Sequence, residues 1–332
     1  MARNSKPPNG FAQRLNRRPA LRWLFWLGVV GIILLLGWLF NSYRGDFYPP
    51  LGSGSPWSLA FWVGEVVDWL VFQLDPLFDV IKWFTQTVLN GLENFLLWLP
   101  WWSVLALIML PAWRLASVRV AIFTGAAIYF IGMLGLWDLC METLALIATA
   151  VLISIVLGIP TGILSAHSDR IDDIVRPVLD VMQTMPAFVY LIPALMFFGI
   201  GTVPGVMATV IFALPPAVRL TNLGIRQVPK DLIEAAQTFG STNLQLLFKV
   251  QLPLALPSIM AGINQTIMLS LSMVVLAAMI AAGGLGREVI MALGQVDIGR
   301  GFVAGTAIVL VAMILDRVTQ SLGKKKRPLK ST

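Results

Sequence analysis

Long apolar runs with few charged side chains recur along most of the chain. A helix of about 20 apolar residues is long enough to cross the hydrocarbon core of a bilayer. Such a helix pairs its own backbone N–H and C=O groups, which lipid cannot do. The pattern therefore predicts an all-α polytopic membrane protein with about eight membrane helices. The predicted spans are residues 23–40, 98–113, 118–137, 140–166, 178–200, 203–222, 258–282 and 301–318.

The distribution of basic residues predicts which side of the membrane each loop occupies. If the N-terminus is cytoplasmic, all but four of the 24 Lys and Arg residues fall in segments on the inner side. Lys and Arg resist translocation, so this asymmetry favours cytoplasmic termini at both ends. The net charge of +7 then records topology and requires no nucleic-acid partner. The four outer residues are Arg44, Lys82, Arg287 and Arg300.

The segments flanking the core have compositions of their own. Residues 1–22 form a basic tail ahead of 23–40, where the absence of a small-residue cleavage signal predicts an uncleaved anchor. Residues 41–97 start with a Gly-Ser linker and continue with apolar residues at helical spacing between acidic ones. This spacing is typical of periplasmic amphipathic helices along the membrane interface, and two ordinary packed helices without a function of their own are the interpretation that we favour. A core at 98–320 and a basic tail at 321–332, expected near anionic membrane lipid, complete the chain.

Few residues of the chain suit catalysis or metal binding. Charged residues make up 12% of the sequence, and the mean hydropathy is +0.80. A single cysteine, Cys140, and a single histidine, His167, exclude an internal disulfide, a cysteine cluster and a His-pair metal site. We expect Cys140 to pack as a small hydrophobe and His167 to lie solvated at the inner membrane edge. The chain also lacks the G-x4-G-K-[ST] loop that cradles ATP phosphates. We expect no enzyme activity, cofactor or metal in the chain.

One polar loop, residues 223–257, lies on the predicted cytoplasmic side of the core. It contains two predicted helix starts with acidic or hydroxyl caps. Gly240 predicts a left-handed end to the first helix, and the second is expected to stop before Pro253. Two short helices with a tight bend and an apolar stripe would form a compact knob that suits docking to another protein. The capping residues are Pro229, Asp231 and Glu234 for the first helix, and Thr242 and Gln245 for the second.

The same loop resembles the EAA loop of ABC importer permeases, whose pattern is EAA-x3-G-x9-I-x-L-P, with valine in place of the usual isoleucine. The matching residues are Glu234, Ala235, Ala236, Gly240, Val250, Leu252 and Pro253. The wider chain is similar to the permease subunits of glycine betaine/proline betaine importers, from about Val63 to Leu322 and most densely after Leu139. The similar segments are 180–193, 212–219, 248–253, 264–266, 271–275 and 283–286.

The resemblance implies a type I ABC importer transmembrane domain at about 139–320, acting in a bacterial inner membrane. Such a permease forms the translocation pathway as a homodimer, and its loop at 223–257 engages a separate ABC ATPase that uses ATP and Mg. A periplasmic substrate-binding protein would deliver a quaternary-ammonium osmolyte. The alternative is a secondary transporter or channel not driven by ATP. An intramembrane enzyme is disfavoured because no cluster of nucleophilic, histidine or acidic residues lies inside the spans.

Polar residues in or near the spans are candidates for lining a pathway, although helix–helix hydrogen bonds explain such residues equally well. Pro186 and Pro193 are expected to interrupt one span, and Pro215–Pro216 another. Broken helices at membrane depth occur where they line a cavity or are covered by protein. The possible pathway residues are Thr184, Pro186, Tyr190, Asn264, Gln265, Thr266, Ser270 and Ser272.

Overall fold

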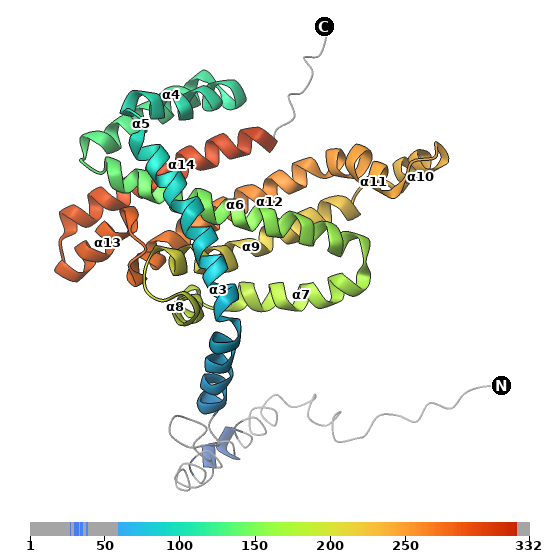
Figure 1. Cartoon of the computed structure of the whole chain (residues 1–332), viewed down its shortest axis with the longest axis horizontal. Helices are drawn as coiled ribbons and strands as arrows, with labels where there is room; N and C mark the ends of the chain where they lie inside the picture. Colours follow the sequence, from blue (N-terminus) through green and yellow to red (C-terminus); the bar gives the residue numbers. More distant parts are fainter. Residues whose placement is uncertain (1–26, 28–29, 33, 36–37, 39–58, 324–332) are drawn as a thin grey trace. The chain divides into compact units, whose positions relative to one another are not determined.

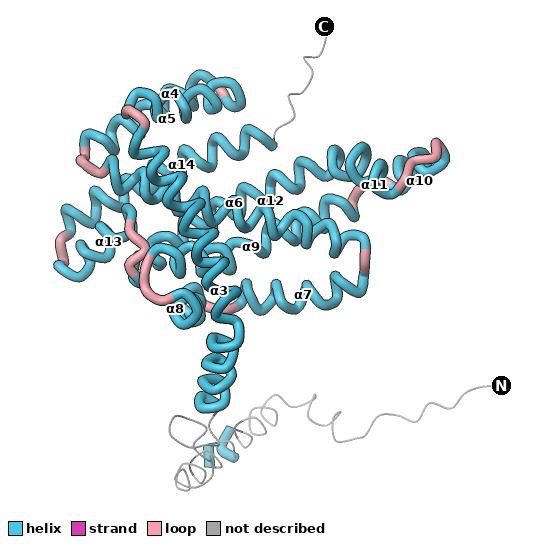
Figure 2. Tube along the Cα trace, in the orientation of Figure 1, coloured by secondary structure: helices cyan, strands magenta, loops and turns pink. Residues whose placement is uncertain are grey.

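The computed structural model describes residues 27, 30–32, 34–35, 38 and 59–323 (Figure 1). These residues form helices and short connections, with no β-strand among them (Figure 2), which confirms the predicted all-α class. The α-helices are α3 (Leu59–Trp98), α4 (Trp101–Pro111), α5 (Val118–Met133), α6 (Trp137–His167), α7 (Asp169–Thr184), α8 (Leu191–Phe198), α9 (Thr202–Arg226), α10 (Lys230–Thr238), α11 (Asn243–Leu246), α12 (Leu252–Ala277), α13 (Gly284–Gln295) and α14 (Ile298–Gly323). Short π-helical or 3-10 segments are η1 (Ala112–Ala116), η2 (Ala187–Tyr190), η3 (Leu247–Gln251) and η4 (Ala278–Ile280).

The predicted tails and most of the anchor lie outside the described residues. Of the anchor at 23–40, residues 27, 30–32, 34–35 and 38 are described, and they are helical. The tail at 1–22, the Gly-Ser linker and residues 324–332 belong to the part that is not described. The chain forms two compact units, Met1–Phe72 and Gln73–Thr332.

Four described helical segments are long and apolar enough to cross a membrane. These segments are Trp137–His167, Thr202–Arg226, Asn243–Ile280 and Ile298–Ser321, in line with four of the predicted spans. Two bent helix pairs raise the number to six if each pair is one span; one is bent by 109° after Trp98 and the other by 112° after Thr184. The predicted spans at 98–113 and 178–200 therefore belong to bent pairs, while 118–137 is represented by the 16-residue helix α5.

The bend after α7 begins where the sequence predicted a break. Met185 and Pro186 are extended, with ψ angles of 137° and 139°. A residue before proline is pushed out of the helical region by the proline ring, which ends α7 at this position. Pro193 does not interrupt a helix, because it lies in the first turn of α8, where the N–H that proline lacks is not needed for a helical hydrogen bond.

Residues predicted as two amphipathic helices form the single 40-residue helix α3, which continues through Pro76. Within the second compact unit, Thr85 and Leu89 on this helix are almost completely buried. Leu89 packs in the main apolar core with Val104 of α4 and Met141 of α6. The interpretation as packed helices therefore holds for this part of α3.

Helices α6, α9 and α12 pack closely because glycines occupy their contact positions. A Cβ on Gly158 would lie 2.8 Å from the Cβ of Ala217, and one on Gly162 would lie 2.7 Å from the carbonyl oxygen of Val218. On α12, a Cβ on Gly262 would lie 3.0 Å from the carbonyl oxygen of Pro216. Small residues four positions apart let membrane helices approach backbone to backbone. These contacts make α9 the central element of the core.

The expected interruption at Pro215–Pro216 is wrong, because α9 runs from Thr202 to Arg226 without a break. Both prolines are buried, as are Ala213, Ala217 and Val218 around them. Proline is tolerated inside a membrane helix when neighbouring helices cover the backbone that it leaves unpaired. The tight contact with α12 at this height supplies that cover.

Side chains of α6 cap the start of α13. The backbone N–H of Gly284 donates to Glu142 Oε2 at 2.8 Å, and that of Leu285 donates to Thr143 Oγ1 at 2.8 Å. Gly283 and Gly284 have φ angles of +82° and +69°, a conformation that L side chains rarely adopt. The acidic side chain of Glu142 also suits the positive end of the helix dipole. This explains two of the glycines in the segment 283–286.

Candidate functional site

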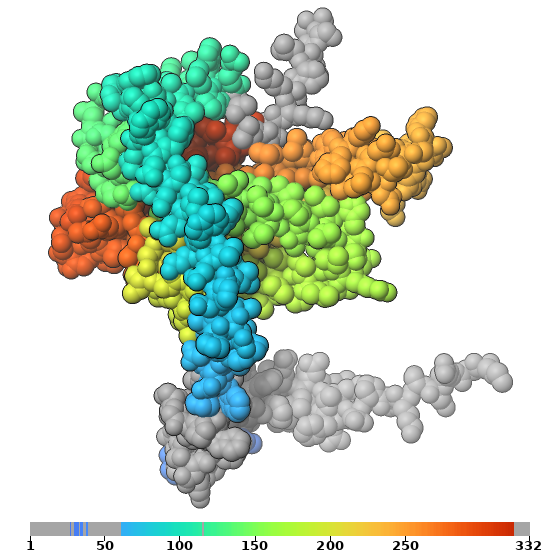
Figure 3. Space-filling view, in the orientation of Figure 1, coloured from blue at the N-terminus to red at the C-terminus, as the bar shows by residue number. Residues whose placement is uncertain are grey.

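The predicted cytoplasmic knob consists of α10 and α11, which extend beyond the ends of α6 and α9 (Figures 1 and 3). Gly240 lies between them with φ at +78°, as predicted. Its N–H donates to the carbonyl oxygen of Gln237 at 2.9 Å, and the N–H of Ser241 donates to that of Ala236 at 3.1 Å. The left-handed residue therefore closes α10 and turns the chain into α11.

One of the two predicted helix caps of the knob is present and the other is wrong. Thr242 and Gln245 form a reciprocal capping box, with bonds of 3.4 and 3.0 Å between side chain and backbone. At α10 the cap position is Pro229, and no side chain caps the helix. Asp231 lies at the second helical position and Glu234 at the fifth, outside the register of a capping box. Glu234 is thus not used in capping.

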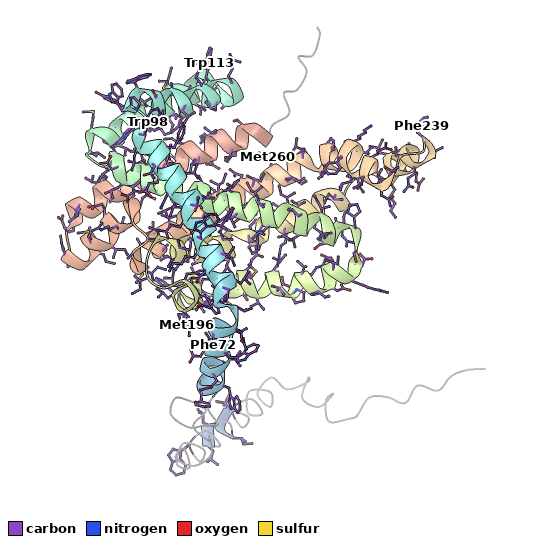
Figure 4. All side chains as sticks on the ribbon, viewed as in Figure 1. Phe72, Trp98, Trp113, Met196, Phe239 and Met260 are labelled. Carbon is purple, nitrogen blue, oxygen red and sulfur yellow. The ribbon has the colours of Figure 1, made fainter. Side chains whose placement is uncertain are left out.

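Helix α10 carries an exposed apolar stripe. The helix contains no buried residue. The side chains of Leu232 and Phe239 are 46% and 90% exposed, and Phe239 lies at the far end of the knob (Figure 4). Glu234 and Ala235 are also exposed. An exposed apolar patch on a projecting element is typical of a surface that docks another protein.

The remaining motif residues connect the knob directly to the membrane core. The second helix does not end before Pro253 as predicted, because α11, η3, α12 and η4 form one helical segment from Asn243 to Ile280. The N–H of Leu252 bonds to the carbonyl oxygen of Leu247, five residues earlier, so the turn that contains Val250 is π-helical. This wider turn accommodates the proline ring without stopping the helix. The knob is therefore joined to α12 by a continuous helix.

A second connection joins this π-helical turn to α6, and the sequence interpretation missed it. His167 is the last residue of α6, where its Nδ1 lies 2.9 Å from the carbonyl oxygen of Ile163. Its Nε2 lies 3.2 Å from Oε1 of Gln251, which is buried. His167 is exposed, as expected, but it belongs to the end of a helix and contacts Gln251, which the sequence interpretation did not predict. The two residues are 84 positions apart, so no local pattern could have paired them.

The candidate pathway residues of α12 divide between structural and exposed positions. Asn264 accepts a hydrogen bond from Thr319 and donates to Asp316 at 3.4 Å, so it ties α12 to α14. Thr266 and Ser270 are fully buried. They follow Gly262 at intervals of four, which places them on the side of α12 that packs on α9. These three candidates therefore lie in helix contacts.

Gln265 and Ser272 lie on the exposed side of α12. The hydroxyl of Ser272 donates to the carbonyl oxygen of Met268 at 3.1 Å, which satisfies it within the helix. The amide of Gln265 makes no hydrogen bond within the described residues, and an amide facing lipid is costly. Among the α12 candidates, Gln265 is the best placed to meet water or another chain.

The three candidates near the α7–α8 bend also differ in their placement. Tyr190 is buried, its hydroxyl donates to the carbonyl oxygen of Met182, and its ring meets that of Phe212 at 5.8 Å. These contacts brace the bend and leave no ring face for a ligand. Thr184 and Pro186 are exposed, and the Thr184 hydroxyl donates to the carbonyl oxygen of Val181 at 3.2 Å.

Ion pairs between α7 and α9 are a second feature that the sequence interpretation missed. Arg219 pairs with Asp180, and Arg226 pairs with Asp169 at 2.8 Å. Asp172 accepts from Asn222 at 2.7 Å and from its helix neighbour Arg176 at 2.7 Å. The alternation of Asp and Arg along α7, together with an arginine inside the span at 203–222, is the signal that could have revealed them. Among the described residues, no group of His, Cys, Asp and Glu could hold a metal ion.

Known proteins are similar in sequence to this chain over most of its length. Residues 158–328 match the family described as "Binding-protein-dependent transport system inner membrane component". The chain belongs to this family. It is 52% identical over 269 residues to the glycine betaine/proline betaine transport system permease protein ProW of Escherichia coli (strain K12), covering 81% of this chain and 76% of that protein. It is 51% identical over 271 residues to the glycine betaine transport system permease protein OpuAB of Bacillus subtilis (strain 168), covering 81% and 95%.

Solved structures share the fold of this inner membrane component. A chain of the MetNI methionine ABC transporter, crystallised in inward-facing conformations, aligns with a TM-score of 0.51 and 22% identity, covering 56% of this chain and 95% of that one. A second crystal form gives a TM-score of 0.50 at 21% identity, with 54% and 92% covered. The expected type I importer fold is confirmed. The family match and the apolar helices together identify the chain as a multi-pass inner membrane protein. Because it is the membrane component of the transporter, it is not the ATPase.

Proposed function

We propose that the chain is the translocation subunit of an ATP-driven importer for glycine betaine, proline betaine or a related quaternary-ammonium osmolyte. The observation that carries this proposal is the identity of 52% over 269 residues with a glycine betaine/proline betaine permease. Identity at this level extends over most of both chains. The fold of an importer and the exposed motif on α10 support the same conclusion.

In this proposal the knob is the site where a separate ABC ATPase docks. The exposed Phe239 and Leu232 would insert into a groove of the ATPase, and the small side chains of Ala235 and Ala236 would let the two backbones approach. The Glu234 carboxylate, which is not used as a cap, is free to meet a polar group of the partner. ATP and Mg act in that partner, and their effect reaches the pathway through η3, α12 and the His167–Gln251 contact.

The rest of the proposed assembly follows from the family and the charge distribution. The family depends on a binding protein, and we place that protein on the periplasmic side, where it would deliver the osmolyte. The basic residues favour cytoplasmic N- and C-termini in a bacterial inner membrane. A second copy of the chain would complete the pathway, and it would cover apolar helix faces such as that of α14, where Phe302 is 75% exposed.

Osmoprotection of living cells tests the proposal. The chain, its ATPase and its binding protein would be expressed in bacteria that lack osmolyte uptake. Growth at high osmolarity and the uptake of radiolabelled glycine betaine would both be measured. We expect uptake when all three components are present and none when any one is omitted. Uptake that persists without the ATPase would instead support the alternative, a secondary transporter or channel.

A further inference from the structure

Helix α7 has an arrangement of side chains that is unusual for a membrane protein. Its polar residues Asp172, Arg176 and Asp180 lie at intervals of four on one face, and that face meets α9. The opposite face is apolar and more than half exposed, with the side chains of Ile174, Val178 and Val181. An exposed apolar face suits lipid or another chain, whereas a polar face turned inward requires a polar interior. The space between α7 and α9 is therefore a polar compartment.

The charges in this compartment continue along the last two turns of α9. Arg219 lies seven residues before the end of α9, which corresponds to about 10 Å along the helix axis. It pairs with Asp180, and their side chains remain 38% and 57% exposed. A charge at membrane depth is tolerated when it faces a partner or a water-filled cavity instead of lipid. Exposure of both members of the pair indicates that they border such a cavity.

A cavity of about 290 Å³ lies at this position, bordered by α6, α7 and α9. Two donors in its wall have no hydrogen-bond partner among the described residues, the hydroxyl of Ser165 and the Nε–H of Arg219. Ser165 is completely buried. Buried polar groups in native proteins are nearly always hydrogen-bonded, so these donors call for an acceptor from water or a ligand. The charged residues in the wall are Asp172, Arg176, Asp180, Arg219 and Arg226.

We infer that this cavity is a compartment of the translocation pathway that receives a small zwitterion. The substrate carboxylate would accept from the Ser165 hydroxyl and Arg219 Nε–H, which are the unpartnered donors. Its quaternary ammonium group cannot donate a hydrogen bond and would be held by the charge of Asp172 or Asp180. The cavity is slightly smaller than a typical drug-binding pocket, which fits a molecule of a few heavy atoms. This inference rests on the proposed function and adds the residues that contact the osmolyte.

Single-cysteine labelling tests whether the cavity is wet and whether it binds the osmolyte. The only native cysteine, Cys140, is buried and would be replaced by alanine. Val175→Cys places a thiol in the cavity wall, and Val178→Cys places one on the exposed apolar face of the same helix. The assembled transporter in phosphatidylglycerol nanodiscs would be treated with an anionic methanethiosulfonate reagent, and labelling of this chain followed by mass spectrometry. Asn222→Cys, on the α9 side of the cavity, is a second reporter.

We expect the cavity thiols to react at least about tenfold faster than Val178→Cys, because a charged reagent enters hydrocarbon poorly. Glycine betaine should slow their labelling several-fold, whereas sucrose at equal osmolarity should not. Arg219→Gln should abolish this protection. Equal labelling on both faces, no protection by glycine betaine, or protection that survives Arg219→Gln would each overturn the inference.

Two further measurements separate the sources of failure. Phosphatidylethanolamine also carries a zwitterionic headgroup, so nanodiscs with and without it would be compared. Protection by this lipid in place of glycine betaine would assign the cavity to a headgroup and overturn the inference. Uptake of glycine betaine by the unmodified transporter would be measured in parallel. Uptake without protection contradicts only the cavity assignment, whereas absent uptake contradicts the proposed function itself.

Discussion

Replacing Gly240 in the knob by valine tests whether the left-handed bend itself positions α10 for docking. No heavy atom lies within 4 Å of the position that a Cβ would occupy, so the substitution creates no clash inside the chain. The φ angle of +78° is the problem, because a residue with a side chain pays roughly 1–2 kcal/mol to adopt it. If that strain is relieved by reorienting α10, affinity for the ATPase should fall about 5- to 30-fold.

Asparagine at the same position is the matched control, since it tolerates the left-handed conformation much better than valine. Affinity between the purified membrane component and its ATPase would be measured by titration in detergent, together with ATP-driven uptake. We expect Gly240→Val to lower both and Gly240→Asn to keep most of both, with equal insertion into the membrane. Equal losses for the two variants would refute the argument from backbone strain. Gly240→Asp should also stop uptake, because it adds a charge to the apolar docking surface.

Three further predictions concern packing and the ends of the chain. Gly162→Ala places a methyl group against the carbonyl oxygen of Val218 and should lower the free energy of unfolding by about 1–3 kcal/mol, measured by thermal denaturation. Gly305→Ala is the control, because its methyl group meets open space and should not lower the free energy of unfolding. Thr143→Val leaves the buried N–H of Leu285 without its acceptor and should cost about 1–3 kcal/mol in the same assay, and an unchanged stability would contradict the capping role. Removal of residues 1–40, with a substitute insertion signal, should spare uptake, and its loss despite normal insertion would show that this segment is required.

The predictable part of this structure depends on patterns that are local in the sequence. Four spans follow from the length of apolar runs, the left-handed bend follows from Gly240, and the second cap follows from the spacing of Thr242 and Gln245. Each depends on residues within one helix or one turn. The break before Pro186 is local for the same reason.

The features that sequence interpretation missed depend on contacts between distant residues. Pro215 and Pro216 continue α9 only because other helices cover them, which their own neighbourhood in the sequence does not reveal. The contact of His167 with Gln251 and the pairing of Arg219 with Asp180 join elements 84 and 39 positions apart. Local polarity identified Tyr190 and Asn264 as pathway candidates, whereas the fold uses both to join helices.

The central claim is that this chain conducts an osmolyte when a separate ATPase acts on its knob. The most direct measurement is the initial rate of glycine betaine uptake into proteoliposomes that contain the purified assembly, with the binding protein outside. The rate with ATP and Mg enclosed should exceed the rate with ADP many-fold, and Gly240→Val in this chain alone should reduce the difference. Uptake at the same rate with ADP, or driven by an ion gradient instead, would contradict the account.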